Sequence, residues 1–177
     1  SIKILCVGRL ENQKGYNILI RALKYLKNDK IKFKCDIYGT GSEKSQILNE
    51  IKDNKLSKNI ELKGVNKNLI NIYHKYDFYI LTSKFEGYPN SLLEGLSAGL
   101  ICISSNCDYG PNEIITNNKN GLLFQNNNYL DLYEKINYLI KNKKKLNTLS
   151  QNAKKEFNYL NFNEDKFLKW KKIVKIK

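Results

Sequence analysis

The residues best suited to chemistry in this sequence are two glutamates, Glu86 and Glu94, separated by seven residues that include a glycine and a proline. Apolar runs over residues 78–81 and 100–103 precede and follow this stretch. The order predicts a strand, a loop, a helix and a second strand. Carboxylates bind hydroxyl groups and the start of a helix binds phosphate, so the stretch predicts a site for a ligand that carries both.

The loop between the two glutamates is predicted to expose the first turn of the helix. Gly87 leaves room for a ligand to approach the backbone. Asn90 stands at the expected N-cap, and the leucine three residues later cannot complete a capping box. The amides around Ser91 and Leu92 are therefore predicted to bind phosphate at the positive end of the helix dipole. An ordinary capped helix with two solvated glutamates is the alternative interpretation.

Two cations occupy another loop, nearer the start of the chain. Apolar residues over 2–7 predict a strand that ends at Gly8, and apolar residues at helical spacing over 18–26 predict the helix that follows. Arg9 and Lys14 lie between the two elements. Open α/β sheets bind ligands in the loops at the carboxyl ends of parallel strands, so this loop is a second candidate site. Two exposed loop cations without a function would give the same pattern.

The two motifs together resemble the GT4 family of retaining glycosyltransferases, which have the GT-B fold. In that family a Gly-Arg pair and a Lys-Gly pair follow the first strand, as Gly8-Arg9 and Lys14-Gly15 do here, and the two glutamates come later in the chain. The resemblance implies an α/β domain with a Rossmann-like parallel sheet and helices on both faces. By the same resemblance, this domain would be the C-terminal, donor-binding half of a GT-B glycosyltransferase.

The resemblance also implies roles for individual residues. Arg9 and Lys14 would neutralise the diphosphate of a nucleotide sugar, and Glu94 would hold the ribose hydroxyls. Glu86 would bind hydroxyls of the donor sugar near the reacting carbon, which makes Glu86, Arg9 and Lys14 the expected catalytic group. Further donor contacts are expected from Gly8, Gly39, Gly41, Val65, Gly87, Tyr88, Asn90, Ser91 and Leu92.

A glycine pair, Gly39 and Gly41, follows the strand predicted over residues 33–38. It is similar to the start of a dinucleotide-binding fingerprint, but Lys44 occupies the third glycine position and the strand is not the first of the chain. Nicotinamide or flavin binding is therefore rejected. The glycines are predicted to allow a tight turn close to a ligand, and Val65, at the tip of the next strand, is expected to lie against the nucleobase.

The sequence Gly-Pro-Asn-Glu-Ile over residues 110–114 predicts a turn and a helix that begins at Asn112 or Glu113. It resembles a subset of GT4 enzymes, many of which use UDP-hexoses or UDP-N-acetylhexosamines. The resemblance therefore implies a UDP-linked donor and a glycan or glycolipid acceptor in cell-surface polysaccharide synthesis.

The formal net charge of +14 would suit a nucleic acid or an acidic membrane surface. Lysines, however, are spread along the whole chain, and arginine occurs only at Arg9 and Arg21, which favours solvated surfaces over a nucleic-acid interface. No apolar stretch is long enough to cross a membrane, and no leader segment is recognisable. A cytoplasmic protein is expected, with a weak peripheral contact at the inner face of the membrane left open. The basic amphipathic stretch over 162–176 could serve that contact, although the resemblance favours its packing across an interdomain hinge.

The four cysteines are Cys6, Cys35, Cys102 and Cys107, and the single histidine is His74. No paired Cys-x-x-Cys motif is present, so a zinc site is not expected and reduced thiols are. His74 is interpreted as a surface or packing residue. No metal or cofactor is expected, since the nucleotide sugar is a substrate.

Predicted strands over 2–7, 33–38, 60–64, 78–81, 101–104 and 121–124 alternate with predicted helices, which indicates a parallel sheet. The helices include a short one over 69–73 and two outer ones over 130–140 and 146–157. Residues 1–177 are interpreted as a single nucleotide-sugar-binding domain. Since the sequence contains no methionine, it is expected to be a fragment or a processed form that lacks the acceptor-binding N-terminal domain, and to bind donor without transferring it.

Three other functions fit parts of the sequence. A non-catalytic module that binds nucleotide sugars would share the same motifs. A basic nucleic-acid-binding domain would show steep salt dependence and no preference for UDP-sugars. A GT-B 2-epimerase is a weaker alternative that product analysis would separate.

Overall fold

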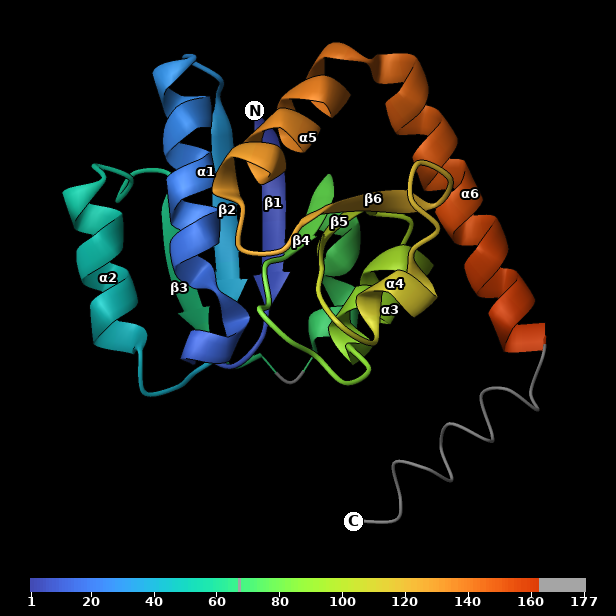
Figure 1. The fold of residues 1–177 in the computed structure, drawn as a ribbon, viewed down its shortest axis with the longest axis horizontal. Coiled ribbons are helices and arrows are strands. Elements are labelled where there is room, and N and C mark those ends of the chain that lie inside the picture. The colour runs from blue at the N-terminus through green and yellow to red at the C-terminus, as the bar shows by residue number, and fades with distance from the viewer. Residues whose placement is uncertain (67, 163–177) are drawn as a thin grey trace.

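The structure is a computed structural model that describes residues 1–66 and 68–162. Its strands are β1 (Ile2–Val7), β2 (Phe33–Tyr38), β3 (Ile60–Gly64), β4 (Phe78–Leu81), β5 (Ile101–Asn106) and β6 (Gly121–Gln125). They form one parallel sheet in the order β3-β2-β1-β4-β5-β6 (Figure 1). The predicted α/β, Rossmann-like architecture is confirmed, and β5 and β6 extend beyond their predicted ends.

The helices are α1 (Tyr16–Asn28), α2 (Lys44–Asp53), α3 (Asn90–Ser97), α4 (Pro111–Ile114), α5 (Tyr129–Lys141) and α6 (Lys143–Phe162). Short 3₁₀ helices lie at η1 (Asn12–Lys14), η2 (Leu69–Asn71) and η3 (Tyr73–Lys75). None of the helices in the described part of the chain is both long and apolar enough to cross a membrane.

Helices cover both faces of the sheet, as predicted. Successive side chains of a strand point to opposite faces, so Phe78 and Ile80 of β4 join the core under α1, α2 and α5, whereas Tyr79 and Leu81 join the core under α3 and α4. All four residues of β4 are buried, which explains why this strand reads as a continuous apolar run.

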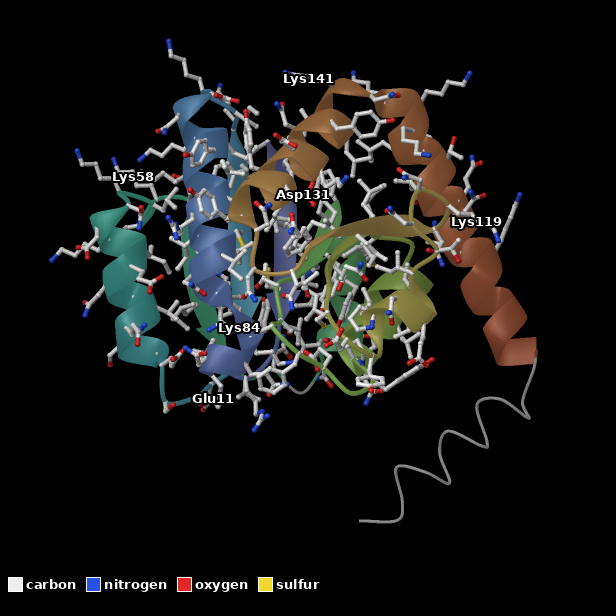
Figure 2. The ribbon with its side chains drawn as sticks, in the orientation of Figure 1. Glu11, Lys58, Lys84, Lys119, Asp131 and Lys141 are labelled. Atoms are coloured by element: carbon white, nitrogen blue, oxygen red, sulfur yellow. The ribbon has the colours of Figure 1, made fainter. Side chains whose placement is uncertain are left out.

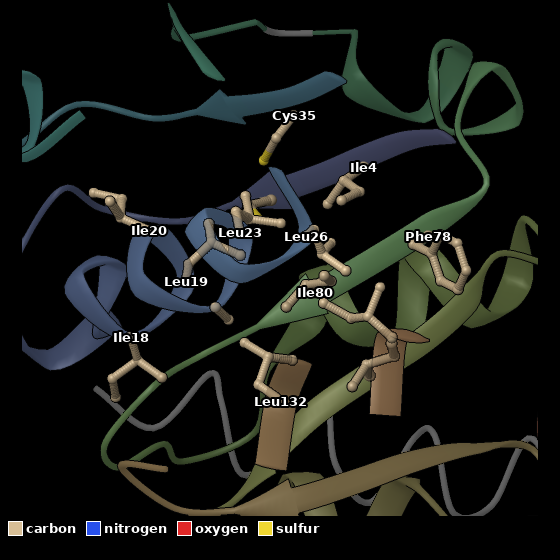
Figure 3. Close-up of a cluster of buried hydrophobic side chains, with 14 of the residues drawn as sticks. Ile4, Ile18, Leu19, Ile20, Leu23, Leu26, Cys35, Phe78, Ile80 and Leu132 are labelled. Carbon is tan, nitrogen blue, oxygen red and sulfur yellow. The ribbon is translucent and has the colours of Figure 1, made fainter. Parts of the chain in front are cut away.

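The helix α1 buries the apolar face that its sequence predicted. Leu23 and Leu26 are fully buried and point toward Ile4 of β1 and Ile80 of β4 (Figure 3). The helix α2 buries Ile47 and Ile51, whereas its Leu48 is 46% exposed. Leu56 is buried beyond the end of this helix.

Three further predictions need correction. Residues 69–73 do not form one helix, because Ile72, at φ −115°, separates two 3₁₀ turns. The helix α4 begins at Pro111, since proline suits the first helical position, and not at Asn112 or Glu113. The two outer helices, predicted over 130–140 and 146–157, are longer than predicted, and only Asn142 separates α5 from α6. The predicted closing helix over 162–176 lies outside the described residues beyond Phe162.

The cysteines lie where their apolar surroundings predicted. All four thiols are buried and free, and burial raises the pKa of Cys102 far above the ordinary value for a thiol. His74 is exposed, in agreement with a surface residue.

All strands are parallel, so their carboxyl ends share one edge of the sheet. Glu11 and Lys84 lie at this edge, whereas Lys58 and Lys141 lie at the opposite end of the molecule (Figure 2). The strand order reverses between β1 and β4, and open α/β sheets bind ligands outside the carboxyl ends of the strands at such a point.

Candidate functional site

The loops that follow β1 and β4 meet at this reversal point and are tied together by hydrogen bonds. The Lys84 amide donates to the Gln13 carbonyl at 2.8 Å, and the Gln13 side-chain amide donates to the Phe85 carbonyl at 2.9 Å. The Thr82 hydroxyl donates to the Lys14 carbonyl at 2.8 Å. The two loops therefore form one structural unit, although they are far apart in the sequence.

A glycine permits this close contact. Gly15 adopts φ +60°, and a Cβ atom placed on it would lie 2.3 Å from the Thr82 carbonyl oxygen. No other residue type fits there without moving the backbone. The Lys-Gly pair in the sequence thus has a packing reason as well as a candidate chemical role.

The centre of the unit is an ion pair between Lys14 and Glu86, whose side chains are 14% and 8% exposed. The Ser83 hydroxyl also donates to Glu86 Oε1 at 2.6 Å. Low exposure limits screening by solvent, so removing Lys14 would leave a poorly solvated charge on Glu86. Both residues were predicted for the site, but their pairing was not.

Arg9 lies at the exposed mouth of the same unit. Its guanidinium donates to the Gln13 side-chain oxygen at 3.2 Å. Gln13 thus links the arginine to the loop that carries Glu86. Gly8, immediately before Arg9, presents its carbonyl to the Tyr16 hydroxyl at 3.1 Å.

Gly39 and Gly41 have a reason internal to the fold. A Cβ atom on Gly39 would lie 1.8 Å from the Gly8 carbonyl oxygen, and one on Gly41 would lie 2.3 Å from the Leu10 carbonyl oxygen. These glycines let the β1 loop pass against the end of β2. Their contact with a donor stays a prediction.

The start of α3 differs from the prediction in one respect. The residue before the helix is Pro89, which has an extended backbone with ψ 97°. Asn90 is the first residue of the helix and its side chain makes no capping hydrogen bond, so the prediction that Asn90 is the N-cap is wrong. The Pro89 carbonyl accepts the Leu92 amide at 3.1 Å, so that amide is not open. Among the described residues, the amides of Asn90 and Ser91 have no acceptor and are the open ones.

The side chains of α3 are fixed by two buried tyrosines. The Tyr73 hydroxyl donates to Glu94 Oε2 at 2.7 Å, and the Tyr79 hydroxyl donates to Ser91 Oγ at 2.7 Å. The two rings stack with centroids 6.2 Å apart. Burial, together with the Glu94 carboxylate, raises the pKa of Tyr73 well above its ordinary value, so its hydroxyl remains a donor at neutral pH.

Two hollows flank the unit. A pocket of about 200 Å³ lies at the ends of β1, β2 and β3 and is lined by Val7, Gly8, Tyr38, Gly39, Gly64, Val65, Asn66 and Leu69. A more open one of about 440 Å³ lies after β5 and is lined by Asp108, Tyr109, Asn112 and Glu113. Gly110 packs between this second hollow and the glutamate loop, since a Cβ atom there would lie 2.0 Å from the Gly87 carbonyl oxygen.

Several predicted residues therefore do come together, while others are placed differently. Gly87 and Tyr88 are exposed beside the unit, and a Cβ atom on Gly87 would meet nothing within 4 Å. Three residues of the site were not predicted from the sequence, namely Gln13, Ser83 and Tyr73. Ser83 could have been found as a polar residue just after a buried strand, but the other two carry no local signal. In residues 1–66 and 68–162, no three His, Cys, Asp or Glu side chains gather as metal ligands.

The fold and this unit define an α/β domain with open amides at a helix start and charged loops at the reversal point of its sheet. Residues 1–156 match the profile of the family described as "Glycosyl transferases group 1". The chain belongs to this family.

Two curated relatives come from Staphylococcus aureus and Bacillus subtilis. The chain is 31% identical to a Staphylococcus aureus poly(ribitol-phosphate) alpha-N-acetylglucosaminyltransferase over 138 residues. The aligned region covers 77% of this chain and 28% of the relative. It is 30% identical to the Bacillus subtilis poly(glycerol-phosphate) alpha-glucosyltransferase over 151 residues, which are 85% of this chain and 22% of that relative. The chain thus spans about a quarter of the length of these relatives.

Solved structures give the same assignment. A TarM variant from S. aureus, crystallised with fondaparinux, alpha-GlcNAc-glycerol and UDP, is 27% identical and has a TM-score of 0.85 over 94% of this chain and 34% of that one. The pneumococcal O-GlcNAc transferase GtfA, crystallised with UDP and GlcNAc, is 26% identical and has a TM-score of 0.85. The match covers 98% of this chain and 35% of the GtfA chain. These matches agree with the predicted GT-B type of domain.

Proposed function

We propose that this chain is the donor-binding domain of a retaining, GT4-type glycosyltransferase that uses a UDP-linked hexose or N-acetylhexosamine. The observation that carries the proposal is the partly buried Lys14–Glu86 pair, held by Ser83 beside the open amides of α3. The UDP bound in TarM and GtfA supports the choice of nucleotide. The polymer acceptors in the names of the curated relatives support a cell-surface glycan as the acceptor.

In the proposed reaction the leaving group is a diphosphate, so catalysis requires stabilisation of the negative charge that develops on it. Arg9 and Lys14 supply positive charge, and the amides of Asn90 and Ser91 supply hydrogen bonds at the positive end of a helix. The proposal needs no resident cofactor or metal ion, since these groups can hold both phosphates.

The two glutamates have different tasks in this proposal. Glu94 accepts hydrogen bonds from the ribose hydroxyls, because its Oε1 atom receives no hydrogen bond from the described residues and is free to do so. Glu86 accepts hydrogen bonds from hydroxyls of the donor sugar once Lys14 turns toward the phosphates. The pocket beside Val65 is mostly apolar and takes the flat face of the base.

The acceptor is proposed to bind a further domain outside this chain. The proposed location is cytoplasmic, with a weak contact between surface lysines and the inner face of the membrane.

Calorimetry of this chain with UDP, GDP and ADP at physiological salt tests the proposal. UDP is expected to bind selectively, and Arg9→Ala to weaken binding by about 10-fold or more through loss of a charged contact. Glu94→Ala is expected to weaken it comparably. Arg21→Ala is the matched control, because Arg21 lies on α1 with its guanidinium 4.1 Å from the centre of the Tyr129 ring. Failure of the folded chain to bind UDP would refute the proposal, and salt-sensitive binding to DNA or RNA would then favour a nucleic-acid-binding domain.

A further inference from the structure

We infer that Tyr73 is a positioning residue that sets the selectivity of the site for ribonucleotides through its hydrogen bond to Glu94. This inference rests on the proposed function, in which Glu94 binds the ribose. It adds a residue that never contacts the ligand but fixes the one that does.

The geometry is that of a rigid support. Tyr73 is 0% exposed and is held in η3, between β3 and β4. Its hydroxyl lies 2.7 Å from Glu94 Oε2 and 3.4 Å from the Ser91 carbonyl oxygen. Stacking on Tyr79 immobilises the ring, so the hydroxyl cannot follow the carboxylate if the latter rotates.

This support determines which way the carboxylate points. With Oε2 engaged by Tyr73, the Oε1 atom of Glu94 is left without a donor among the described residues. An ionised carboxylate has about four acceptor positions, so Oε1, and the second lone pair of Oε2, can accept two neighbouring hydroxyls. Orientation before binding lowers the entropic cost of fixing the side chain, which strengthens the contact with the ribose.

The chain contains a matched control for the loss of this hydroxyl. The Tyr76 hydroxyl donates to Asp36 Oδ2, also at 2.7 Å. Asp36 lies on β2, and Tyr76 precedes β4 at the end of the strand opposite to the site. Tyr73→Phe and Tyr76→Phe therefore delete the same group from the same kind of bond, and only the first concerns the proposed ribose contact.

The test is calorimetry of the chain with UDP and with its 2′-deoxy and 3′-deoxy analogues. The wild-type chain is expected to bind UDP about 10-fold or more tightly than the weaker of the two analogues, the size expected for a hydrogen bond to a charged group. Glu94→Gln should remove most of that ratio. Tyr73→Phe should reduce it by about 3-fold or more, and Tyr76→Phe should leave it unchanged. Equal urea midpoints for the two Phe variants would show that stability does not account for the difference.

Each outcome decides a separate point. If Tyr73→Phe prefers UDP to the deoxy analogues by the same factor as the wild-type chain, the inference is overturned and the proposed function still stands. A wild-type chain that binds UDP without preferring it to either analogue overturns the ribose role of Glu94, and the inference with it. A folded chain that binds no UDP refutes the proposed function itself.

Discussion

Removing the cation from the Lys14–Glu86 pair should destabilise the fold more than removing the carboxylate. In Lys14→Met the Glu86 side chain, 8% exposed in the folded protein, keeps the Ser83 hydroxyl as its one partner among residues 1–66 and 68–162. In Glu86→Gln the lysine loses its partner too, but its long side chain is already 14% exposed and can extend its ammonium group into water. The two substitutions remove the same ion pair and leave residual charges with very different access to solvent.

The magnitude follows from this difference. Breaking a buried pair by removing one partner costs about 3–5 kcal/mol when the remaining charge is uncompensated. The Ser83 hydroxyl compensates part of that cost, since a hydrogen bond to a charged group contributes about 1.5–3 kcal/mol. We therefore expect Lys14→Met to lower the free energy of unfolding by about 1–3 kcal/mol. Glu86→Gln should lower it by about 1 kcal/mol or less.

Urea unfolding, with the linear extrapolation of the unfolding free energy, measures both values and the double variant. Lys14→Met/Glu86→Gln should be more stable than Lys14→Met alone, because no charge is then left in the site. A coupling free energy of about 1 kcal/mol or more is expected from the cycle. Equal costs for the two single variants, or no recovery in the double variant, would refute the reasoning.

Two further perturbations test other parts of the domain. Gly39→Ala should lower the free energy of unfolding by about 2–4 kcal/mol, because Gly39 adopts φ +149° and the added Cβ would lie 1.8 Å from the Gly8 carbonyl oxygen. Gly87→Ala should change the free energy of unfolding by less than about 0.5 kcal/mol, because its Cβ would meet nothing within 4 Å, and it should weaken UDP binding. Similar urea midpoints for the two variants would contradict this. Burial raises the pKa of Tyr79 and Cys102 above the ordinary values of 10.0 and 9.0, so above pH 9 the unfolded chain loses protons that the folded chain keeps. The free energy of unfolding should then fall by up to about 1.4 kcal/mol per pH unit for each such group, and a value that stays constant in urea titrations up to pH 11 would exclude the effect.

The fold could be predicted from the sequence because local patterns determine most of it. The four consecutive apolar residues over 78–81 predicted the strand β4, and the apolar residues at helical spacing over 18–26 predicted the helix α1. Alternation of strands and helices then implied a parallel sheet. The helix over 69–73 failed for a local reason, since nothing in the residue types shows that the backbone at Ile72 would break it into two turns.

The site could be predicted only in outline. Arg9, Lys14, Glu86 and Glu94 are charged residues in or after loops that follow apolar strands, and this position marks them in the sequence. The pairing of Lys14 with Glu86 joins residues 72 positions apart, so it depends on the order of the strands. The role of Tyr73 depends on packing, because a buried tyrosine looks the same in sequence whether its hydroxyl meets a carboxylate or a carbonyl.

The ion pair also explains how Lys14 can stay in place at the proposed anion site before a ligand binds. Without a partner the lysine could extend its ammonium group into water, and Glu86 holds it at the site in the ligand-free state. In the proposed function the diphosphate replaces Glu86 as the partner of Lys14, so the lysine is never left unpaired. The freed carboxylate is then available to sugar hydroxyls only when a nucleotide is present, which couples recognition of the diphosphate to recognition of the sugar.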